Sequence, residues 1–434
     1  MTHPAYVFPN AAVASPHYLA TAEGLRVLMD GGNAVDAAVA TNLVLSVVCP
    51  HLCGTGGDLF AIVYAEEKIH GLNSSGRLPR AAKLPPDGQV PQRGIRSATV
   101  PGAVAGWLAL LEKFGSMQVK ELSRSAIRYA REGFFPSPSL AGGIERSRVL
   151  IGDDPEFRRI FLSGGRITNP ELAETLEDLD GFYHGRVAQN APPPFTPEDF
   201  AEHEALWVEP MHAGFLDVEV YEMPPNSRGH LVLKALEILE PLDGLSDDDP
   251  EFHLRLLRAI ESAAHLDGDT VYLCVQDSSG MAVSLNESNF MGFGSGVVIP
   301  GTGVHLHNRG AYHTAESYKG GERPIHTLSP AMAMKDGRPK LIFGTMGGEA
   351  QIQIHMQLLA RIFVLGQDPA DAVSAPRWVK HGRGELMVEE GLPDIGGQVV
   401  PRTDQAGHAH VIQTTDEGLA AASDPRCDGL AAGY

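Results

Sequence analysis

The chain is poor in cysteine and in long apolar runs, and each shortage excludes a class of protein. Four cysteines among 434 residues do not suggest a disulfide framework. No apolar run approaches the ~18 residues that span a membrane, so no membrane partner is expected. The first residues, Met1 to Tyr6, contain neither the basic stretch nor the apolar core of a secretion signal. The sequence therefore predicts a cytoplasmic protein.

Basic residues are also scarce. The chain has 34 Lys and Arg against 54 Asp and Glu, which gives a formal net charge of −20. No basic run is present that would follow a phosphate backbone, so nucleic acid is not an expected partner. Hydrophobic residues make up 43%, enough for a full core without disulfides. The length suits two average domains or one large one.

Two short segments raise the question of a cofactor. Cys49 and Cys53 flank His51, a spacing that suits metal ligands, but no second ligand pair follows at a suitable distance. The glycine-rich segment 54–58 follows a helix and precedes a strand, the reverse of a dinucleotide-binding fingerprint. Apolar packing and a tight turn are the favoured interpretations. We predict no metal and no organic cofactor.

The first part of the chain predicts two helices and a strand. The segment 34–48 is apolar on nearly all sides, which indicates a helix buried between layers of the fold. Asn33 is placed to cap it, with Asp36 at the third helical position. A helix over 21–30 precedes it and ends at a glycine pair. A buried strand over 59–64 follows.

The composition changes near the middle of the chain. Residues from about 100 to 260 favour helices. From 270 to about 350, strands, glycine-rich turns and Pro/Ser loops dominate. A long helix is predicted over 351–365, and two hairpin-like strands at 399–400 and 410–414.

Thr270 stands at the head of a predicted strand, 271–277, which a four-residue turn joins to a second strand, 282–285. If the chain were cut before Thr270, that residue would carry both a hydroxyl and a free α-amine. An α-amine titrates near ~7.7–8.0 and can act as the base for its own hydroxyl. The alternative is that Thr270 only begins a strand, where threonine is common. This segment alone does not decide between them.

Nine short motifs, spread along the whole chain, favour the interpretation of Thr270 as a nucleophile. They are GGNAVDAAVA at 31–40, GTGGDLF at 54–60, VPGAV at 100–104, DT at 269–270, FGSGV at 293–297, LSP at 328–330, GTMGG at 344–348, APR at 375–377, and SDPR at 423–426 with Gly429. In this order they resemble the γ-glutamyltransferase (γ-glutamyl transpeptidase) family of N-terminal nucleophile hydrolases.

The resemblance implies a four-layer αββα sandwich formed by one unit. It implies self-cleavage before Thr270, which would leave segments 1–269 and 270–434 bound to each other. Thr270 would be the nucleophile, and Ser288 would hydrogen-bond to it. Gly347 and Gly348 would form the oxyanion hole, where glycine lets the backbone approach the tetrahedral intermediate closely.

The substrate-binding positions depart from the family pattern. Ser75 replaces the arginine that holds the glutamyl α-carboxylate, and Arg77 is the nearest cation. The acidic pair that holds the α-amine corresponds to Ala311-Tyr312. A serine cannot reproduce a bidentate arginine–carboxylate contact. The candidate substrate contacts are Ser75, Arg77, Asn289, Arg309, His326 and Thr327, where His326 and Thr327 replace a pair of serines.

Each of these candidates also has an ordinary structural interpretation. Arg77 would be a solvated loop cation, Arg309 would pair with a carboxylate, and His326 would brace its loop.

The predicted function is a self-processing γ-glutamyltransferase-like amide hydrolase or acyltransferase, made as an inactive precursor and working through an acyl-enzyme. Its substrate would be a γ-glutamyl or related small amide of the glutathione type. One alternative is an acylase or amidohydrolase of the same fold acting on a non-glutamyl amide, such as a small dicarboxylic monoamide. Another is a catalytically inactive homologue used as a binding protein. The sequence leaves the oligomeric state open, a homo-oligomer included.

Overall fold

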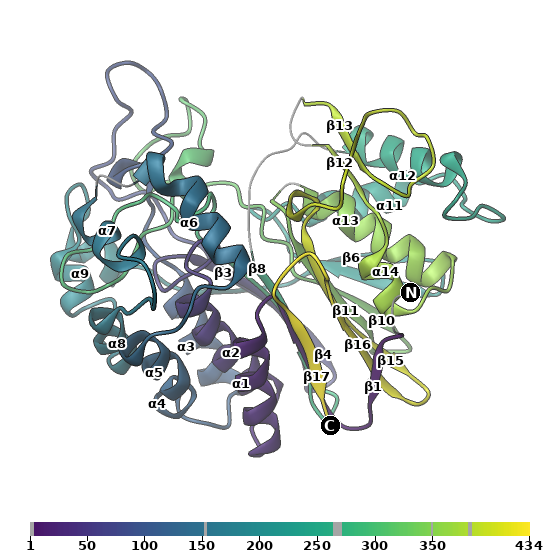
Figure 1. Ribbon diagram of the computed structural model, residues 1–434, viewed down its shortest axis with the longest axis horizontal. Coiled ribbons are helices and arrows are strands. Elements are labelled where there is room, and N and C mark those ends of the chain that lie inside the picture. The colour runs from purple at the N-terminus through teal and green to yellow at the C-terminus, as the bar shows by residue number, and fades with distance from the viewer. Residues whose placement is uncertain (1–3, 152–153, 264–270, 349, 381–383) are drawn as a thin grey trace.

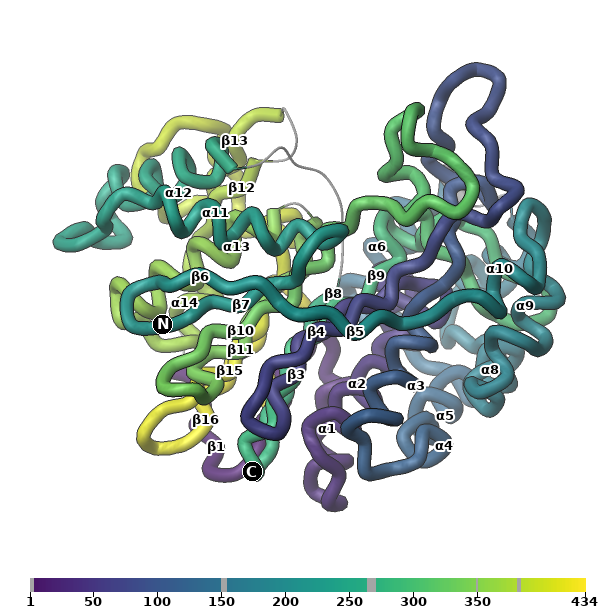
Figure 2. The backbone as a smooth tube through the Cα atoms, turned by 180° about the vertical axis from the view of Figure 1, so that it is seen from behind, coloured from purple at the N-terminus to yellow at the C-terminus, as the bar shows by residue number. Residues whose placement is uncertain are grey.

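The computed structural model describes residues 4–151, 154–263, 271–348, 350–380 and 384–434. Two seven-stranded sheets pack face to face, and helices cover the outer side of each (Figure 1). The αββα sandwich is therefore confirmed. In the view from behind, α1 to α6 and α8 to α10 lie on one side of the sheets and α11 to α14 on the other (Figure 2). Thr270 lies outside the described residues.

The first sheet, here called sheet I, has the strand order β17-β2-β8-β9-β3-β4-β5. Its pairs are antiparallel, and the predicted hairpin 271–285 forms its centre as β8 and β9. The strands of sheet I are β2 (Ala12–Ser15), β3 (Asp58–Ala65), β4 (Lys68–Ser74), β5 (Leu206–Val208), β8 (Val271–Gln276), β9 (Ala282–Ser288) and β17 (Leu430–Gly433).

Sheet II has the order β1-β16-β15-β11-β10-β7-β6 and is also antiparallel. A smaller third sheet, β12-β13-β14, lies beside it. The strands are β1 (Tyr6–Phe8), β6 (Met211–Phe215), β7 (Val218–Glu222), β10 (Ala331–Lys335), β11 (Arg338–Met346), β12 (Trp378–Lys380), β13 (Leu386–Glu389), β14 (Gln398–Val400), β15 (His408–Thr415) and β16 (Gly418–Ser423).

The helices divide between the two outer layers. Those covering sheet I or its ends are α1 (Tyr18–Met29), α2 (Ala34–Val48), α3 (Ala103–Phe114), α4 (Val119–Leu122), α5 (Arg124–Glu132), α6 (Pro138–Ile151), α7 (Pro155–Phe161), α8 (Pro170–Glu177), α9 (Arg186–Asn190) and α10 (Pro197–Ala201). Those covering sheet II are α11 (His230–Ile238), α12 (Pro250–Ala263), α13 (Ala350–Leu359), which continues as a π-helical turn (Ala360–Val364), and α14 (Pro369–Ser374). Short 3₁₀ turns occur at Ile95–Ser97, Arg309–Tyr312 and Asp404–Ala406.

The helix α2 shows why the sequence pattern works. It spans Ala34–Val48 as predicted, and every residue in it is buried. Asn33 Oδ1 accepts from the N–H groups of Val35 and Asp36. Asp36 Oδ2 in turn accepts from the Asn33 N–H, which completes a capping box. Because α2 is apolar all round, it is enclosed by sheet I and the helices outside it.

Three apolar cores separate the layers. One lies between sheet I and its helices and another between sheet II and its helices. The third lies between the sheets and includes Phe60, Tyr272, Met332, Ile342 and Ile412. This third core fixes the two sheets against each other, so the ends of their strands keep the same relative positions.

Both strands predicted at 399–400 and 410–414 are present as β14 and β15, but the prediction that they form a hairpin is wrong. β14 pairs in parallel with β13, whereas β15 lies between β11 and β16 in sheet II. The sequence analysis also missed β17, which pairs with β2. The prediction failed because partners in a sheet are chosen by long-range packing rather than by nearness in sequence.

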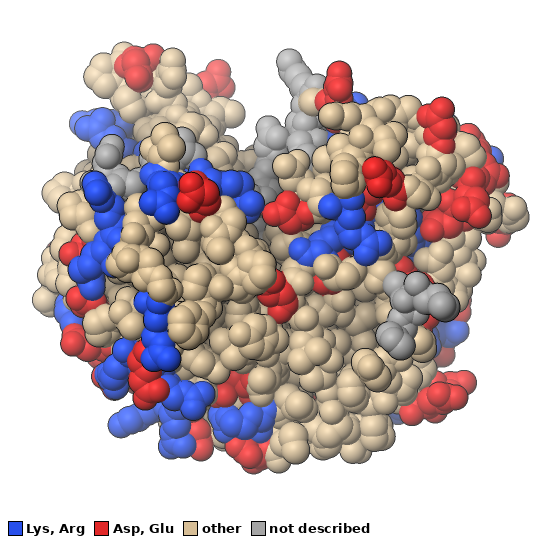
Figure 3. All heavy atoms as spheres, in the orientation of Figure 1, with Lys and Arg blue, Asp and Glu red and all other residues tan. Residues whose placement is uncertain are grey.

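The surface carries both signs of charge. In Figure 3, acidic side chains gather over α12, and basic ones lie among acidic ones over α4 and α5. No helix within the described ranges is long and apolar enough to cross a membrane.

Candidate active site

The contact between Tyr272 and Gly344 aligns the start of β8 with the end of β11. Tyr272 belongs to sheet I and Gly344 to sheet II, and a Cβ on Gly344 would lie only 2.4 Å from the Tyr272 ring. Glycine is therefore needed in β11 for the sheets to approach this closely. The ring of His410, which pairs with Gly344 in sheet II, lies parallel to the Tyr272 ring with centroids 6.2 Å apart.

Asn286 makes a second link between the sheets. Its Nδ2 donates to the Val271 carbonyl at 3.0 Å and to the Thr345 carbonyl at 3.3 Å. Val271 is the first residue of β8, and Thr345 is the last but one of β11. The strand that follows Thr270 in sequence thus begins beside the strand that leads into Gly347.

Gly347 and Gly348 join β11 to α13 with φ angles of +141° and +57°. These left-handed values favour glycine. The carbonyl oxygens of the two glycines accept from the N–H groups of Ala350 and Gln351. Their own N–H groups have no acceptor within the described residues, which suits the predicted oxyanion hole. The role itself stays a prediction.

Ser288 is the last residue of β9 and is fully buried. It pairs with Asp58 of β3, while the preceding residue, Glu287, pairs with Val271. The Phe290 N–H donates to Ser288 Oγ at 2.7 Å. The predicted supporting hydroxyl therefore lies one register position beyond the start of β8, and its catalytic part stays a prediction because Thr270 is outside the described residues.

Asp58 is a buried carboxylate beside Ser288. Its Oδ1 accepts from the N–H groups of Gly76 and Gly102 at 3.0 and 3.1 Å. Its Oδ2 accepts from His326 Nε2 at 2.8 Å, and His307 Nδ1 lies 3.6 Å away. Burial alone would raise the pKa of Asp58, but these histidines and the nearby Arg309 outweigh it and hold the pKa below its usual range.

The His326 side chain is hydrogen-bonded to the Asp58 carboxylate. Its ring also packs against Phe60, with centroids 4.9 Å apart, and burial lowers the pKa of His326 to about 3. The imidazole is therefore neutral, and it is fully buried against Phe60. This geometry favours the interpretation in which His326 braces its loop over the one in which it contacts substrate.

Two of the candidate substrate contacts, Arg309 and Thr327, lie together, and their role stays a prediction. Arg309 is fully buried, its Nη1 donates to Thr327 Oγ1 at 3.2 Å, and its guanidinium lies 4.2 Å from the Phe290 ring centroid. Tyr312 meets the same ring edge-on at 5.5 Å. Since Phe290 also contacts Ser288 through its N–H, this group borders the candidate site.

Arg228 was missed by the sequence analysis. Its Nη1 donates to the Tyr312 hydroxyl at 2.8 Å, so a second arginine reaches the position where the family has an acidic residue. Arg228 lies in the turn before α11, far from Tyr312 in sequence, and no local pattern distinguishes it from other surface arginines. Only the fold brings the two side chains together.

Ser75 and Asn289 contact protein groups. Ser75 Oγ donates to Asn73 Oδ1 at 2.8 Å and accepts from Asn226 Nδ2 at 3.2 Å. Asn289 Nδ2 lies 2.7 Å from His305 Nε2 and 3.2 Å from the Pro50 carbonyl. Both side chains are buried and hold loops around the site.

Arg77 differs from the other candidates in its exposure. Its Nη1 donates to the Gly321 carbonyl at 3.0 Å. It lines a small cavity together with Arg80 and Arg323, and neither Ser288 nor Gly347 is part of that lining. A substrate role for Arg77 stays a prediction, and the solvated-cation interpretation fits its exposure.

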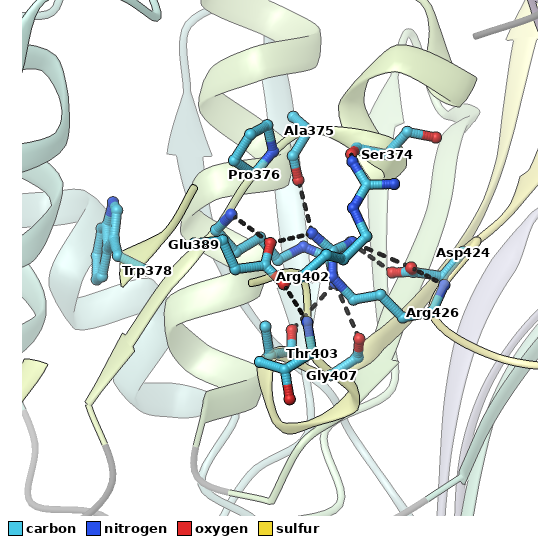
Figure 4. Close-up of polar contacts among 12 residues, drawn as sticks. Ser374, Ala375, Pro376, Trp378, Glu389, Arg402, Thr403, Gly407, Asp424 and Arg426 are labelled. Atoms are coloured by element: carbon cyan, nitrogen blue, oxygen red, sulfur yellow. Dashed lines mark hydrogen bonds and ion pairs between the residues drawn. The ribbon is translucent and has the colours of Figure 1, made fainter. Parts of the chain in front are cut away.

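Arg377, Arg426, Asp424 and Glu389 form a buried ion cluster next to the start of β15 (Figure 4). Arg377 Nη2 lies 2.7 Å from Asp424 Oδ2, Arg426 Nη1 lies 3.1 Å from Asp424 Oδ1, and Arg426 also pairs with Glu389. Arg377 Nη1 donates to the Gly407 carbonyl at 3.1 Å. Two of the nine motifs, APR and SDPR, thus meet here and fix the turn that leads into β15.

The possible metal ligands near position 50 have other contacts. His51 Nε2 lies 3.1 Å from Ser139 Oγ, and Cys53 Sγ lies 3.6 Å from the Cys49 carbonyl. Among the residues described, no three His, Cys, Asp or Glu side chains are grouped to hold a metal ion.

The fold and site define an enzyme of the N-terminal nucleophile hydrolase class. The crystal structure of cephalosporin acylase from Bacillus halodurans superposes with a TM-score of 0.92 at 30% identity, covering 100% of this chain and 97% of that one. The Gamma-glutamyltranspeptidase family model matches residues 20–265 and 249–434. The chain therefore belongs to the γ-glutamyltranspeptidase family.

Curated relatives match over nearly their whole length. The glutathione hydrolase-like YwrD proenzyme of Bacillus subtilis is 32% identical, with 97% of this chain and 98% of that protein covered. The oxamate amidohydrolase proenzyme of Klebsiella pneumoniae is 29% identical, with 100% of both covered. These relatives carry different substrate names, so family membership does not by itself fix the substrate.

Proposed function

We propose that this protein is a self-processing amide hydrolase whose nucleophile is Thr270 and whose substrates are small amides without a complete glutamyl head group. The observation that carries the proposal is the convergence of the β8 start, Ser288 and the Gly347-Gly348 turn at one end of the two sheets. The naming of the curated relatives as proenzymes supports processing.

Processing would begin with attack of Thr270 Oγ on the Asp269 carbonyl carbon. The C–N bond breaks, the Thr270 amine is released, and an ester joins the two segments. Water then hydrolyses the ester, leaving a carboxylate on Asp269 and a free hydroxyl on Thr270. The products are segments 1–269 and 270–434.

Catalysis would use the same atoms on an external amide. Thr270 Oγ attacks the substrate carbonyl, its proton passes to the Thr270 α-amine, and the N–H groups of Gly347 and Gly348 stabilise the oxyanion. The leaving amine takes the proton and departs. Water then attacks the acyl-enzyme ester and regenerates the hydroxyl.

The altered anchors support a non-glutamyl substrate. Ser75 is held by Asn73 and Asn226, and Tyr312 is hydrogen-bonded to an arginine rather than offering a carboxylate for an α-amine. The likeness to an oxamate amidohydrolase and to a cephalosporin acylase points the same way. A γ-glutamyl amide is the second candidate, favoured by the likeness to a glutathione hydrolase-like protein.

Intact mass spectrometry and a substrate panel test the proposal. Wild-type protein should yield fragments 1–269 and 270–434 without added protease, whereas Thr270→Ala should remain one chain and inactive. Cleavage of Thr270→Ala at the same bond would refute the intramolecular mechanism. An uncleaved wild-type chain without amidase activity would instead favour a binding protein.

The panel compares kcat/KM for γ-glutamyl 4-nitroanilide with its desamino and descarboxy analogues. We expect losses well below those of a site with both anchors, since a site with fewer polar partners discriminates less strongly. A loss of about 10⁴-fold on removal of either group would show glutamyl recognition by another anchor.

A further inference from the structure

Two buried histidines in β15 point into the space between the sheets. Alternate residues of a strand face opposite sides. Ala409 and Val411 pack in the core beneath the helices of sheet II, whereas Ile412 packs in the core between the sheets. His408 and His410 share the face of Ile412 and therefore face sheet I.

The two histidines lie at different depths. His410 is level with Gly344 and is covered by the parallel ring of Tyr272. His408 is level with Met346, one repeat of about 6.8 Å nearer to the end of the sheets. The residue before His408 lies beside the glycine turn, because a Cβ on Gly347 would lie 3.4 Å from the Cα of Gly407.

The backbone at this point is held firmly. Arg377 Nη1 donates to the carbonyls of Ala406 and Gly407, each at 3.1 Å, and the Ala409 N–H donates to Asp424 Oδ2 at 2.9 Å. The buried ion cluster therefore sets the position of His408 relative to the glycine turn.

The His408 ring has unused hydrogen-bonding capacity. It is 1% exposed, and neither ring nitrogen has a partner within the described ranges. Burial lowers the pKa of His408, and nearby Asp424 opposes that shift without reversing it. The ring is therefore neutral, with one N–H donor and one acceptor, and leaving both unmatched in a buried position is unfavourable.

We propose that His408 contacts the acyl part of the substrate and donates its ring N–H to a carboxylate or carbonyl oxygen there. This proposal rests on the proposed function, because it concerns how the acyl end of the amide substrate enters between the sheets past Gly347. A hydrogen bond from His408 would favour short amides that carry an acceptor oxygen on the acyl chain. His410, of the same type and on the same face, has no such role because the Tyr272 ring covers it.

The test compares three 4-nitroanilides with acyl chains of similar length. Glutaric acid mono-anilide has a terminal carboxylate, its methyl ester has a neutral carbonyl, and the pentanoyl anilide has no acceptor. The ratio of kcat/KM between each acceptor-bearing anilide and the pentanoyl anilide is measured for wild type, His408→Phe, His408→Gln and His410→Phe. Self-cleavage of every variant, followed by intact mass, reports correct folding, and His408→Leu replaces His408→Phe if the latter does not cleave.

We expect His408→Phe to lower the ratio about 10- to 100-fold, mainly through KM, as loss of a hydrogen bond to substrate does. His408→Gln, which keeps an N–H donor, should restore part of it, and His410→Phe should leave it unchanged. A fall for the carboxylate alone would assign an anionic acyl end, and a fall for both would assign any acceptor oxygen. An unchanged ratio in a cleaved, active His408→Phe overturns the inference and leaves the proposed function standing. A wild type that neither cleaves nor hydrolyses any anilide overturns both.

Discussion

Glu287 illustrates how burial controls a single ionisable residue near the site. Its Oε1 accepts from the Gly54 N–H at 2.7 Å and its Oε2 from Asn42 Nδ2 at 3.0 Å. Burial nevertheless dominates and raises the pKa of Glu287 to about 8. The carboxyl thus links the end of β9, next to Ser288, to the glycine-rich turn before β3 and to α2, and it remains protonated at neutral pH.

The raised pKa predicts a pH-dependent stability. An unfolded glutamate titrates near ~4.3, so the folded state binds this proton more tightly. The contribution to stability is complete below ~4.3 and is lost as pH rises through about 8. In a single-chain Thr270→Ala background, the free energy of unfolding should fall relative to that of the Glu287→Gln variant between pH 5 and 8, with a slope of up to ~1.4 kcal/mol per pH unit.

Urea unfolding across that pH range makes the measurement. Glu417→Gln, which changes an exposed carboxylate in the β15–β16 turn, is the matched control and should run parallel to the background. Parallel curves for Glu287→Gln as well would contradict the raised pKa.

At the scale of elements, the decisive contact is the close approach of β8 and β11. The Tyr272 ring fills the space above Gly344, and its hydroxyl lies 3.0 Å from Ser284 Oγ. The His410 ring lies parallel to the Tyr272 ring, with centroids 6.2 Å apart. The contact of Tyr272 with Gly344 holds the start of β8 beside the end of β11, the strand that leads into the glycine turn.

Gly344→Ala should therefore disturb both stability and processing. The new methyl group would lie 2.4 Å from the ring, and such overpacking typically costs ~1–3 kcal/mol. Self-cleavage, followed by the rate of appearance of the two fragments, should slow as well. Gly214→Ala in β6 is the matched control, since a Cβ there meets nothing within 4 Å. Equal behaviour of the two variants would show that the close approach does not position β8.

At the scale of the whole molecule, the buried ion cluster joins segments that are distant in sequence. Asp424 follows β16, Glu389 ends β13, and the arginines Arg377 and Arg426 also donate to carbonyls at the end of α14. The cluster thereby connects the small third sheet, a helix and sheet II around the turn that precedes His408. Burial by itself would raise the pKa of Asp424, but Arg377 and Arg426 hold it below its usual range.

Asp424→Asn should destabilise the whole fold, by ~3–5 kcal/mol, because it leaves two buried guanidinium groups undercompensated. The stability that Asp424 provides is present above its unfolded pKa of ~3.9 and is lost as pH falls toward the folded value. The variant should therefore lose less stability than its parent on acidification below pH 4. Chemical unfolding at pH 7 and at pH 3 checks both parts. Asp217→Asn, at an exposed pair with Lys335, is the control and should change little.

Local pattern was enough for much of the architecture. The α2 bounds and its capping box follow from an apolar run after Asn33, and the hairpin of β8 and β9 follows from two apolar runs around a polar turn. The nine motifs indicated the family and hence the four layers. These features are readable because each depends on neighbouring residues or on motif order.

The tertiary structure alone decided which side chains meet. It placed β15 between β11 and β16, hydrogen-bonded His326 to Asp58, left Arg77 exposed at a small cavity, and brought Arg228 to Tyr312. These contacts join residues far apart in the chain, and the free energy that selects them comes from packing two sheets and two helical layers together. A single sequence carries no local signal of contacts between residues that are far apart in the chain. The sequence therefore indicated the class of enzyme, whereas the arrangement of side chains around the candidate site came only from the tertiary structure.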